Sequence, residues 1–179
     1  RQRQMCIRDR CGEDTKKPGG DSPESNQSSA ETPTAKSPEV GGIDLGDPKT
    51  LDKIIAEAID LQELELRGES PELVLYAPGK ETPYTGWGKA FHDNGQIRNL
   101  AQYKDGKKSG FARWWYGNEQ KGSETTWKNG KVMTVAGWKP NGEKCPETNV
   151  LNGNGVHVLF KEDGTEKERK TYRDGERVD

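Results

Sequence analysis

Residues 88–107 read GKAFHDNGQIRNLAQYKDGK and contain the whole pattern that decides the fold. Phe91 is followed three residues later by an Asn-Gly pair at 94–95, and Tyr103 is followed by an Asp-Gly pair at 105–106. These are the residue pairs that accept positive φ in tight hairpin turns. The stretch therefore predicts two short antiparallel strands, each closed by a turn.

The same pattern continues to the end of the chain. First positions recur at spacings of 24, 23 and 22 residues, and a second position follows each of them by twelve residues. A turn pair follows every position, which gives eight turns at spacings of 11 to 13 residues. This spacing leaves strands of about seven to nine residues and no room for a helix between them. The first positions are Phe91, Trp115, Trp138 and Phe160, and the second are Tyr103, Trp127, Val150 and Tyr172. The turn pairs are Asn94-Gly95, Asp105-Gly106, Asn118-Glu119, Asn129-Gly130, Asn141-Gly142, Asn152-Gly153, Asp163-Gly164 and Asp174-Gly175.

Residues 76–179 are thus predicted to form four hairpin repeats in a mainly β fold, an antiparallel meander. A period in the low twenties is typical of repeat arrays, in which each unit buries its apolar side only against its neighbours. Stability should therefore be collective. The predicted repeat core consists of the aromatic residues at the repeated positions: Phe91, Tyr103, Trp115, Trp127, Trp138, Phe160 and Tyr172.

The motifs at 88–96 and 103–107 resemble the MORN-variant repeat, and also bacterial proteins labelled YwqK-family antitoxins. The resemblance covers roughly residues 84–179 and fades in the third repeat, where Cys145-Pro146 and Val150 break the pattern. It implies an elongated, single-layer antiparallel β-meander of MORN-like hairpins that is used for interactions with proteins or membranes.

Composition confines the folded part to this region. The chain is 28% hydrophobic and 32% charged, which is too polar for a compact core throughout its 179 residues. All the aromatic residues lie between Tyr76 and Tyr172. The net charge of -2, with well-mixed signs, indicates no basic face for nucleic acid. No apolar stretch is long enough for a transmembrane helix.

The first 46 residues are predicted to lie outside the fold. Residues 1–10 (RQRQMCIRDR) resemble a translated sequencing adapter and are interpreted as a non-native segment; the alternative is a genuine basic arm. Cys11, followed by Gly-Glu-Asp, looks like the lipid-attachment residue at the mature end of a bacterial lipoprotein; the alternative is an incidental cysteine. Residues 11–46, rich in Ser, Pro, Gly, Thr and Glu, predict a disordered tether.

One amphipathic helix is predicted before the repeats, within residues 47–68. Asp47-Pro48 provides an N-cap followed by proline at the first helical position, and apolar residues recur on one face to about residue 65. Gly68 should end it. We expect the helix to cover one end of the sheet, so that the first strand is not an open edge; the alternative is a helix that binds a partner.

Two large aromatic side chains, Trp114 and Tyr116, are predicted to lie on the sheet face opposite Trp115. The other repeats have no such pair on that face, so the two are a candidate partner-binding site. The alternative is that they pack under the helix or under residues 71–83.

No catalytic, metal or cofactor site is predicted. The two histidines, His92 and His157, are interpreted as surface polar residues, and Cys145 as a semi-exposed, incidental thiol. The acidic residues at the turns lack the spacing of a calcium loop. The leading hypothesis is a non-enzymatic envelope lipoprotein whose repeats bind another, unidentified protein, with the membrane reached only through the lipid anchor. The alternatives are a cytoplasmic antitoxin or immunity-like protein and an enzyme that uses carboxylates.

Overall fold

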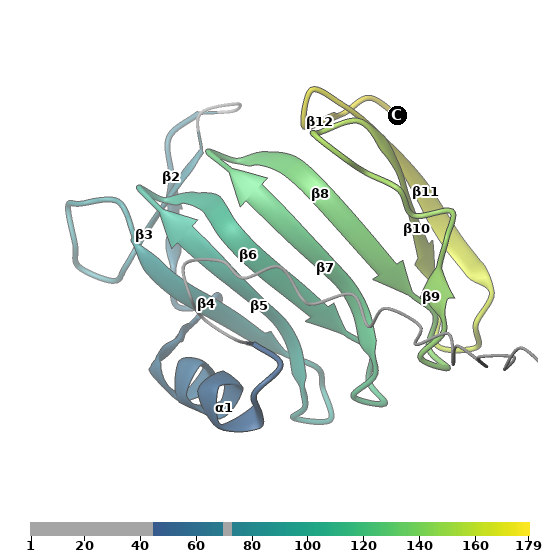
Figure 1. The fold of residues 1–179 in the computed structure, drawn as a ribbon. Coiled ribbons are helices and arrows are strands. Elements are labelled where there is room, and N and C mark those ends of the chain that lie inside the picture. The colour runs from purple at the N-terminus through teal and green to yellow at the C-terminus, as the bar shows by residue number, and fades with distance from the viewer. Residues whose placement is uncertain (1–44, 70–72) are drawn as a thin grey trace, which may run out of the picture. The chain divides into compact units, whose positions relative to one another are not determined.

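The computed structural model describes residues 45–69 and 73–179 (Figure 1). Cys11, residues 1–10 and nearly all of the predicted tether lie outside these residues. The described part confirms a mainly β fold with one helix and an antiparallel meander in an open sheet. Leu45 corrects the predicted boundary of the tether, because it is only 6% exposed and belongs to a core cluster.

The large sheet contains seven strands in the order β1-β4-β5-β6-β7-β8-β9 (Figure 1). All neighbours pair antiparallel except β1 and β4, which pair parallel. The strands are β1 (Ile59–Asp60), β4 (Gly86–Phe91), β5 (Ile97–Lys104), β6 (Lys107–Trp115), β7 (Lys121–Lys128), β8 (Lys131–Trp138) and β9 (Lys144–Cys145). The first two predicted repeats and the beginning of the third thus lie in one sheet.

The fourth repeat forms a separate sheet of three strands, β10 (Gly155–Phe160), β11 (Glu166–Arg173) and β12 (Glu176–Arg177). The division occurs in the third repeat, where Pro146 directly follows the two-residue β9. Proline has no backbone N–H to continue a ladder, so the strand stops there. Because Val150 and Tyr172 then pack with Val132 and Val135, the repeats do not continue as a single layer.

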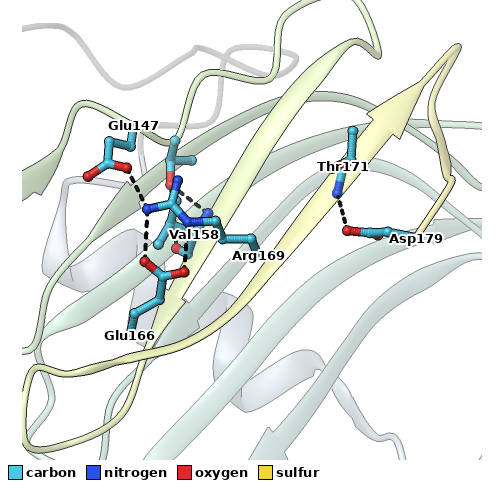
Figure 2. Close-up of polar contacts among 7 residues, drawn as sticks. Glu147, Val158, Glu166, Arg169, Thr171 and Asp179 are labelled. Atoms are coloured by element: carbon cyan, nitrogen blue, oxygen red, sulfur yellow. Dashed lines mark hydrogen bonds and ion pairs between the residues drawn. The ribbon is translucent and has the colours of Figure 1, made fainter.

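Side chains fasten the three-stranded sheet to the segment that precedes it (Figure 2). The guanidinium of Arg169 on β11 donates to Glu166 at 2.7 and 2.8 Å and to Glu147 in the connection after β9. At the C-terminal end of the same sheet, the Thr171 backbone N–H donates to the Asp179 carboxylate at 3.0 Å. Arg169 is exposed, so its ion pairs orient the segments that they join but contribute little to the free energy of folding.

All eight predicted turns form, but they are of two kinds. In the two-residue turns, at 105–106, 129–130, 152–153 and 174–175, both residues have positive φ. In the three-residue loops, which end at residues 95, 119, 142 and 164, only the last residue has positive φ. There the Asn or Asp side chain accepts a hydrogen bond from the backbone N–H two residues later, at 2.8 to 3.1 Å.

The helix α1 (Pro48–Glu57) begins as predicted and ends earlier than predicted. Asp47 accepts from the Thr50 N–H at 3.0 Å and from its hydroxyl at 2.6 Å. Ala58 is already extended, and the chain continues into β1, where the Leu61 N–H donates to the Lys89 carbonyl at 2.8 Å. The prediction of a helix to about residue 65 was wrong because pairing with the open edge of β4 outweighs local helical periodicity.

The two remaining strands, β2 (Glu65–Arg67) and β3 (Val74–Tyr76), form a hairpin. Leu75 of β3 packs against Tyr103 and its neighbours on one face of the large sheet. On the opposite face, α1 packs with a cluster that includes Leu100, Phe111 and Trp115. We call these the hairpin face and the helix face.

The predicted repeat core is divided between the two faces. Trp115 belongs to the helix-face cluster, whereas Tyr103, Trp127 and Tyr172 belong to clusters on the other side. In the first repeat, a bulge places two residues of β5 opposite Phe91, so the alternation of side chains reverses before Tyr103. The members are therefore not one core: Tyr103 and Trp115 are buried, while the rest are half-buried, namely Phe91, Trp127, Trp138, Phe160 and Tyr172.

Candidate binding cleft

A cavity of about 280 Å³ lies between β5–β8 on the hairpin face and strands β10–β11 of the smaller sheet. We call it the cleft. Its floor is hollow because small side chains, Ala112, Ser123 and Thr125, lie between Trp114 and Trp127. The residues that line it are Asn99, Lys108, Ala112, Arg113, Trp114, Ser123, Thr125, Trp127, Val132, Val135, His157, Lys170 and Tyr172.

A second cavity of about 420 Å³ adjoins the cleft and shares Lys108 and Trp127 with it. We call it the outer groove. The β2–β3 side of this groove carries Leu66 and Leu73, which are 58% and 39% exposed. The groove is lined by Leu66, Leu73, Leu75, Tyr103, Gly106, Lys107, Lys108, Trp127, Asn129, Gly130, Lys131 and Glu176. The two cavities thus adjoin at Trp127 and Lys108, and their linings include apolar, aromatic and basic side chains.

Two lysines give the cleft its charge. The ammonium of Lys108 lies 4.8 Å from the centre of the Trp127 ring, in cation–π geometry. Burial lowers the pKa of Lys108, and the nearby Lys170 lowers it further. Lys170 itself lies 3.5 Å from the carboxylate of Glu168. No aspartate or glutamate is among the residues that line the cleft, so its lining is positively charged.

His157 completes this side of the cleft. It lies on β10 directly opposite Lys170 on β11. Burial lowers its pKa to about 4, with a further lowering from Lys170 that Glu168 partly offsets. The imidazole is therefore neutral at pH 7, where it can donate one hydrogen bond and accept another.

The indole N–H of Trp127 is buried and, within the described residues, has no hydrogen-bond partner. A buried donor without a partner costs about 1–3 kcal/mol. The ring that carries it lines both the cleft and the outer groove.

The predicted pair of binding aromatics is only partly realised. Trp114 is half-buried and lines the cleft. Tyr116 is only 2% exposed, and its hydroxyl donates to the Trp138 carbonyl at 2.8 Å. Its ring meets Trp114 edge-on, with centroids 4.5 Å apart. The hypothesis that both rings form an exposed site is therefore wrong for Tyr116. This residue instead links the end of β6 to the end of β8.

The alternative packing predicted for this pair, under the helix or residues 71–83, is also not what holds Tyr116. Burial raises its pKa to about 12, with contributions from Glu162 and Cys145. Glu162 lies in the loop between β10 and β11 and accepts from the Gly117 N–H at 2.9 Å. The fourth repeat thus supplies Glu162 and the third repeat supplies Cys145.

The remaining sequence predictions have mixed outcomes. His92 is half-buried, and its Nε2 lies 2.9 Å from the Trp115 carbonyl oxygen, so it links two repeats and is not a free surface residue. Cys145 is 1% exposed, which corrects the prediction of a semi-exposed thiol. Cys145 pairs with Gly137 of β8, and the Thr148 N–H donates to the Cys145 carbonyl at 3.3 Å.

Sequence reasoning missed Lys108, Lys170 and His157 as members of a site. Strand alternation offered one usable signal, since Lys108, Ala112 and Trp114 share a face of β6 and leave a gap between two large side chains. Lys170 and His157 had no such signal, because their approach depends on the return of the smaller sheet toward the larger one.

Comparison with known protein families, with curated proteins and with solved structures found no match. Within residues 45–69 and 73–179, no group of three or more His, Cys, Asp or Glu side chains is placed to hold a metal ion. No helix in the described part has the length and apolar character to cross a membrane.

Proposed function

We propose that this protein is a non-enzymatic scaffold that binds a segment of another protein in the cleft and the outer groove. The observation that carries this proposal is that two cavities, of about 280 and 420 Å³, lie side by side and share Trp127 and Lys108 in their linings. An extended segment can place successive side chains in both.

The residue types on this surface support a peptide-binding role. Trp114, Trp127 and Tyr172 present large rings with few rotatable bonds, which is the composition of interface hot spots. Leu66 and Leu73 add exposed apolar area beside them. A folded domain rarely leaves such residues together on a concave surface unless they bind something.

The location of the protein stays a prediction. Lipidation of Cys11 would hold the binding surface at the bacterial envelope, with the residues between Cys11 and Leu45, rich in Ser, Pro and Gly, as the tether. The proposed binding surface does not depend on that location, since every residue that lines it belongs to the described part of the chain.

A cleft-filling variant tests the proposal. Peptides selected from a displayed random library by the full chain should lose at least about tenfold in affinity, roughly 1.4 kcal/mol, on Thr125→Trp, because the indole would occupy the cleft. The matched control is Thr126→Trp. Thr126 is the next residue of β7, and its hydroxyl bonds Thr134 at 2.7 Å on the other face. Failure to select any peptide, or equal affinities for both variants, would refute the proposal.

A further inference from the structure

The cleft holds positive charge without a matching negative group. Within the described residues, the Lys108 ammonium has no ion pair or hydrogen bond, and it lies over the Trp127 ring, 4.8 Å from the ring centre. The Lys170 ammonium forms one ion pair, with Glu168 at 3.5 Å. Two cations therefore share a partly enclosed space with one countercharge, which leaves an excess of one positive charge.

The other charged or titratable groups near this space do not neutralise the excess positive charge of the two lysines. The guanidinium of Arg113 turns to the helix face, where it donates to Glu124 at 2.7 Å and to the Leu45 carbonyl at 2.9 Å. His157 is neutral at pH 7. The hydroxyl of Tyr172 is also uncharged there, because burial raises its pKa.

Like charges in a partly desolvated space repel, and an anion placed between them would convert that repulsion into attraction. A carboxylate suits the space, since it accepts charge-assisted hydrogen bonds, which are stronger than hydrogen bonds between neutral groups. A basic ligand would meet the opposite effect. The positive charge of the cleft thus favours a negatively charged occupant over a positively charged one.

We propose that the bound segment carries a glutamate or aspartate whose carboxylate lies in the cleft and neutralises Lys108 and Lys170, while an apolar side chain beside it packs on Leu66 and Leu73 of the outer groove. This inference rests on the proposed function and adds the chemistry of the partner to it. The partner is thus an acidic and apolar protein segment in an extended conformation, which spans both cavities as a folded helix end could not.

Two labelled peptide pools test this directly. Each pool consists of eight-residue peptides that are random except at position four, which is Glu in one pool and Gln in the other. Fluorescence polarisation with the full chain at low salt should show the Glu pool binding about tenfold tighter, the equivalent of roughly 1.4 kcal/mol. The preference should weaken with added salt, because exposed parts of the charge are screened.

The double variant Lys108→Met, Lys170→Met should reduce this preference to less than about twofold, which corresponds to less than roughly half a kcal/mol. Methionine keeps the apolar stem that packs on Trp127. Lys128→Met with Lys167→Met is the matched control, since both of these lysines are exposed, lie on the same strands as cleft residues and do not line the cleft. The single variants Lys108→Gln and Lys170→Gln should each lose part of the preference, and they serve if the double variant does not fold.

Three outcomes would overturn the inference, and they separate it from the proposed function. Equal binding of the two pools, abolished by Thr125→Trp, would leave a peptide-binding protein with no preference for acid. Absence of any binding sensitive to Thr125→Trp would remove both. Binding of phosphatidylserine vesicles that requires Lys108 and Lys170, without preference between the pools, would make the occupant a membrane surface.

Discussion

The imidazole of His157 links the stability of the fold to pH. Its pKa falls from 6.5 to about 4 on folding, chiefly because burial disfavours the charged form. Between these values the unfolded chain binds the proton more strongly than the folded one. Stability is therefore complete above about pH 6.5 and is lost as pH falls toward 4, by an amount on the order of 3 kcal/mol.

Replacing this residue with glutamine should remove that part of the acid sensitivity. We expect the urea-unfolding free energies of wild type and His157→Gln to differ by a constant above pH 7 and to converge or cross between pH 6.5 and 4. Carboxylates such as Asp163 and Glu166, whose pKa values are also lowered, destabilise both proteins equally in acid. Parallel curves over the whole range would show that His157 does not titrate as proposed.

The site shows where inference from single residues succeeds. Trp114 was chosen from strand alternation as a candidate binding residue, and it lines the cleft. Tyr116, chosen by the same rule, is buried, because the loop that carries Glu162 folds over it. Alternation gives the face on which a side chain lies, but whether another part of the chain covers that face is a tertiary property.

Among the turns, the second three-residue loop departs from its counterparts at one position. Glu119 has φ 66°, where the other loops have glycine. A residue with a Cβ in this conformation costs about 1–2 kcal/mol relative to glycine. Glu119→Gly should therefore raise the free energy of unfolding by roughly 1 kcal/mol, as measured by urea denaturation.

The reciprocal change provides the control. Gly95 occupies the same place in the first loop, with φ 83° and nothing within 4 Å of a built Cβ. Gly95→Glu should cost a similar amount, because backbone conformation is the main difference between the two sites. If neither change alters stability, the conformation of these loops is not what distinguishes them.

The strands and turns were largely predictable because Asn-Gly and Asp-Gly pairs carry local conformational information. The end of α1 and the length of β9 were not. Ala58 continues the helical periodicity, but it is extended, and Ile59 and Asp60 after it pair with β4. Cys145 is followed by a proline whose effect on the last repeat depends on what surrounds it. Competition between local preference and pairing decided both boundaries.

The described part of the molecule is held together unevenly. Besides side-chain packing, a few backbone hydrogen bonds join the large sheet to the smaller sheet and to the segment before it. Among them, the Val132 N–H donates to the Gly175 carbonyl at 3.0 Å, and the Val135 N–H donates to the Val150 carbonyl at 3.1 Å. The central strands β5, β6 and β7 instead have full ladders on both sides. The smaller sheet should thus open at a lower free energy than the centre of the larger one.

Native-state hydrogen exchange checks this expectation. Amides of β10 and β11 should exchange faster than those of β6, and Val135→Ala should widen the difference, because it weakens the cluster that joins the sheets. Thr134→Ala, on the opposite face of the same strand, is the control. Equal protection of both sheets would indicate a single cooperative unit. Repeat count alone could not have revealed this division, which follows from the return of the fourth repeat.

The two-residue turns lie at one end of the strands and the three-residue loops at the other, and the two ends differ in the room that they leave for inserted residues. A side chain at Gly153 would meet the Gly175 nitrogen at 2.5 Å, and one at Gly175 would meet the Val132 carbonyl oxygen at 2.8 Å, so these two turns are packed too closely for added residues. Gly95 and Gly164, in the three-residue loops, have open space around them. Insertions at that end would extend into solvent. Descendants of such a gene could therefore diversify their loops there while the sheet and its cleft stay unchanged.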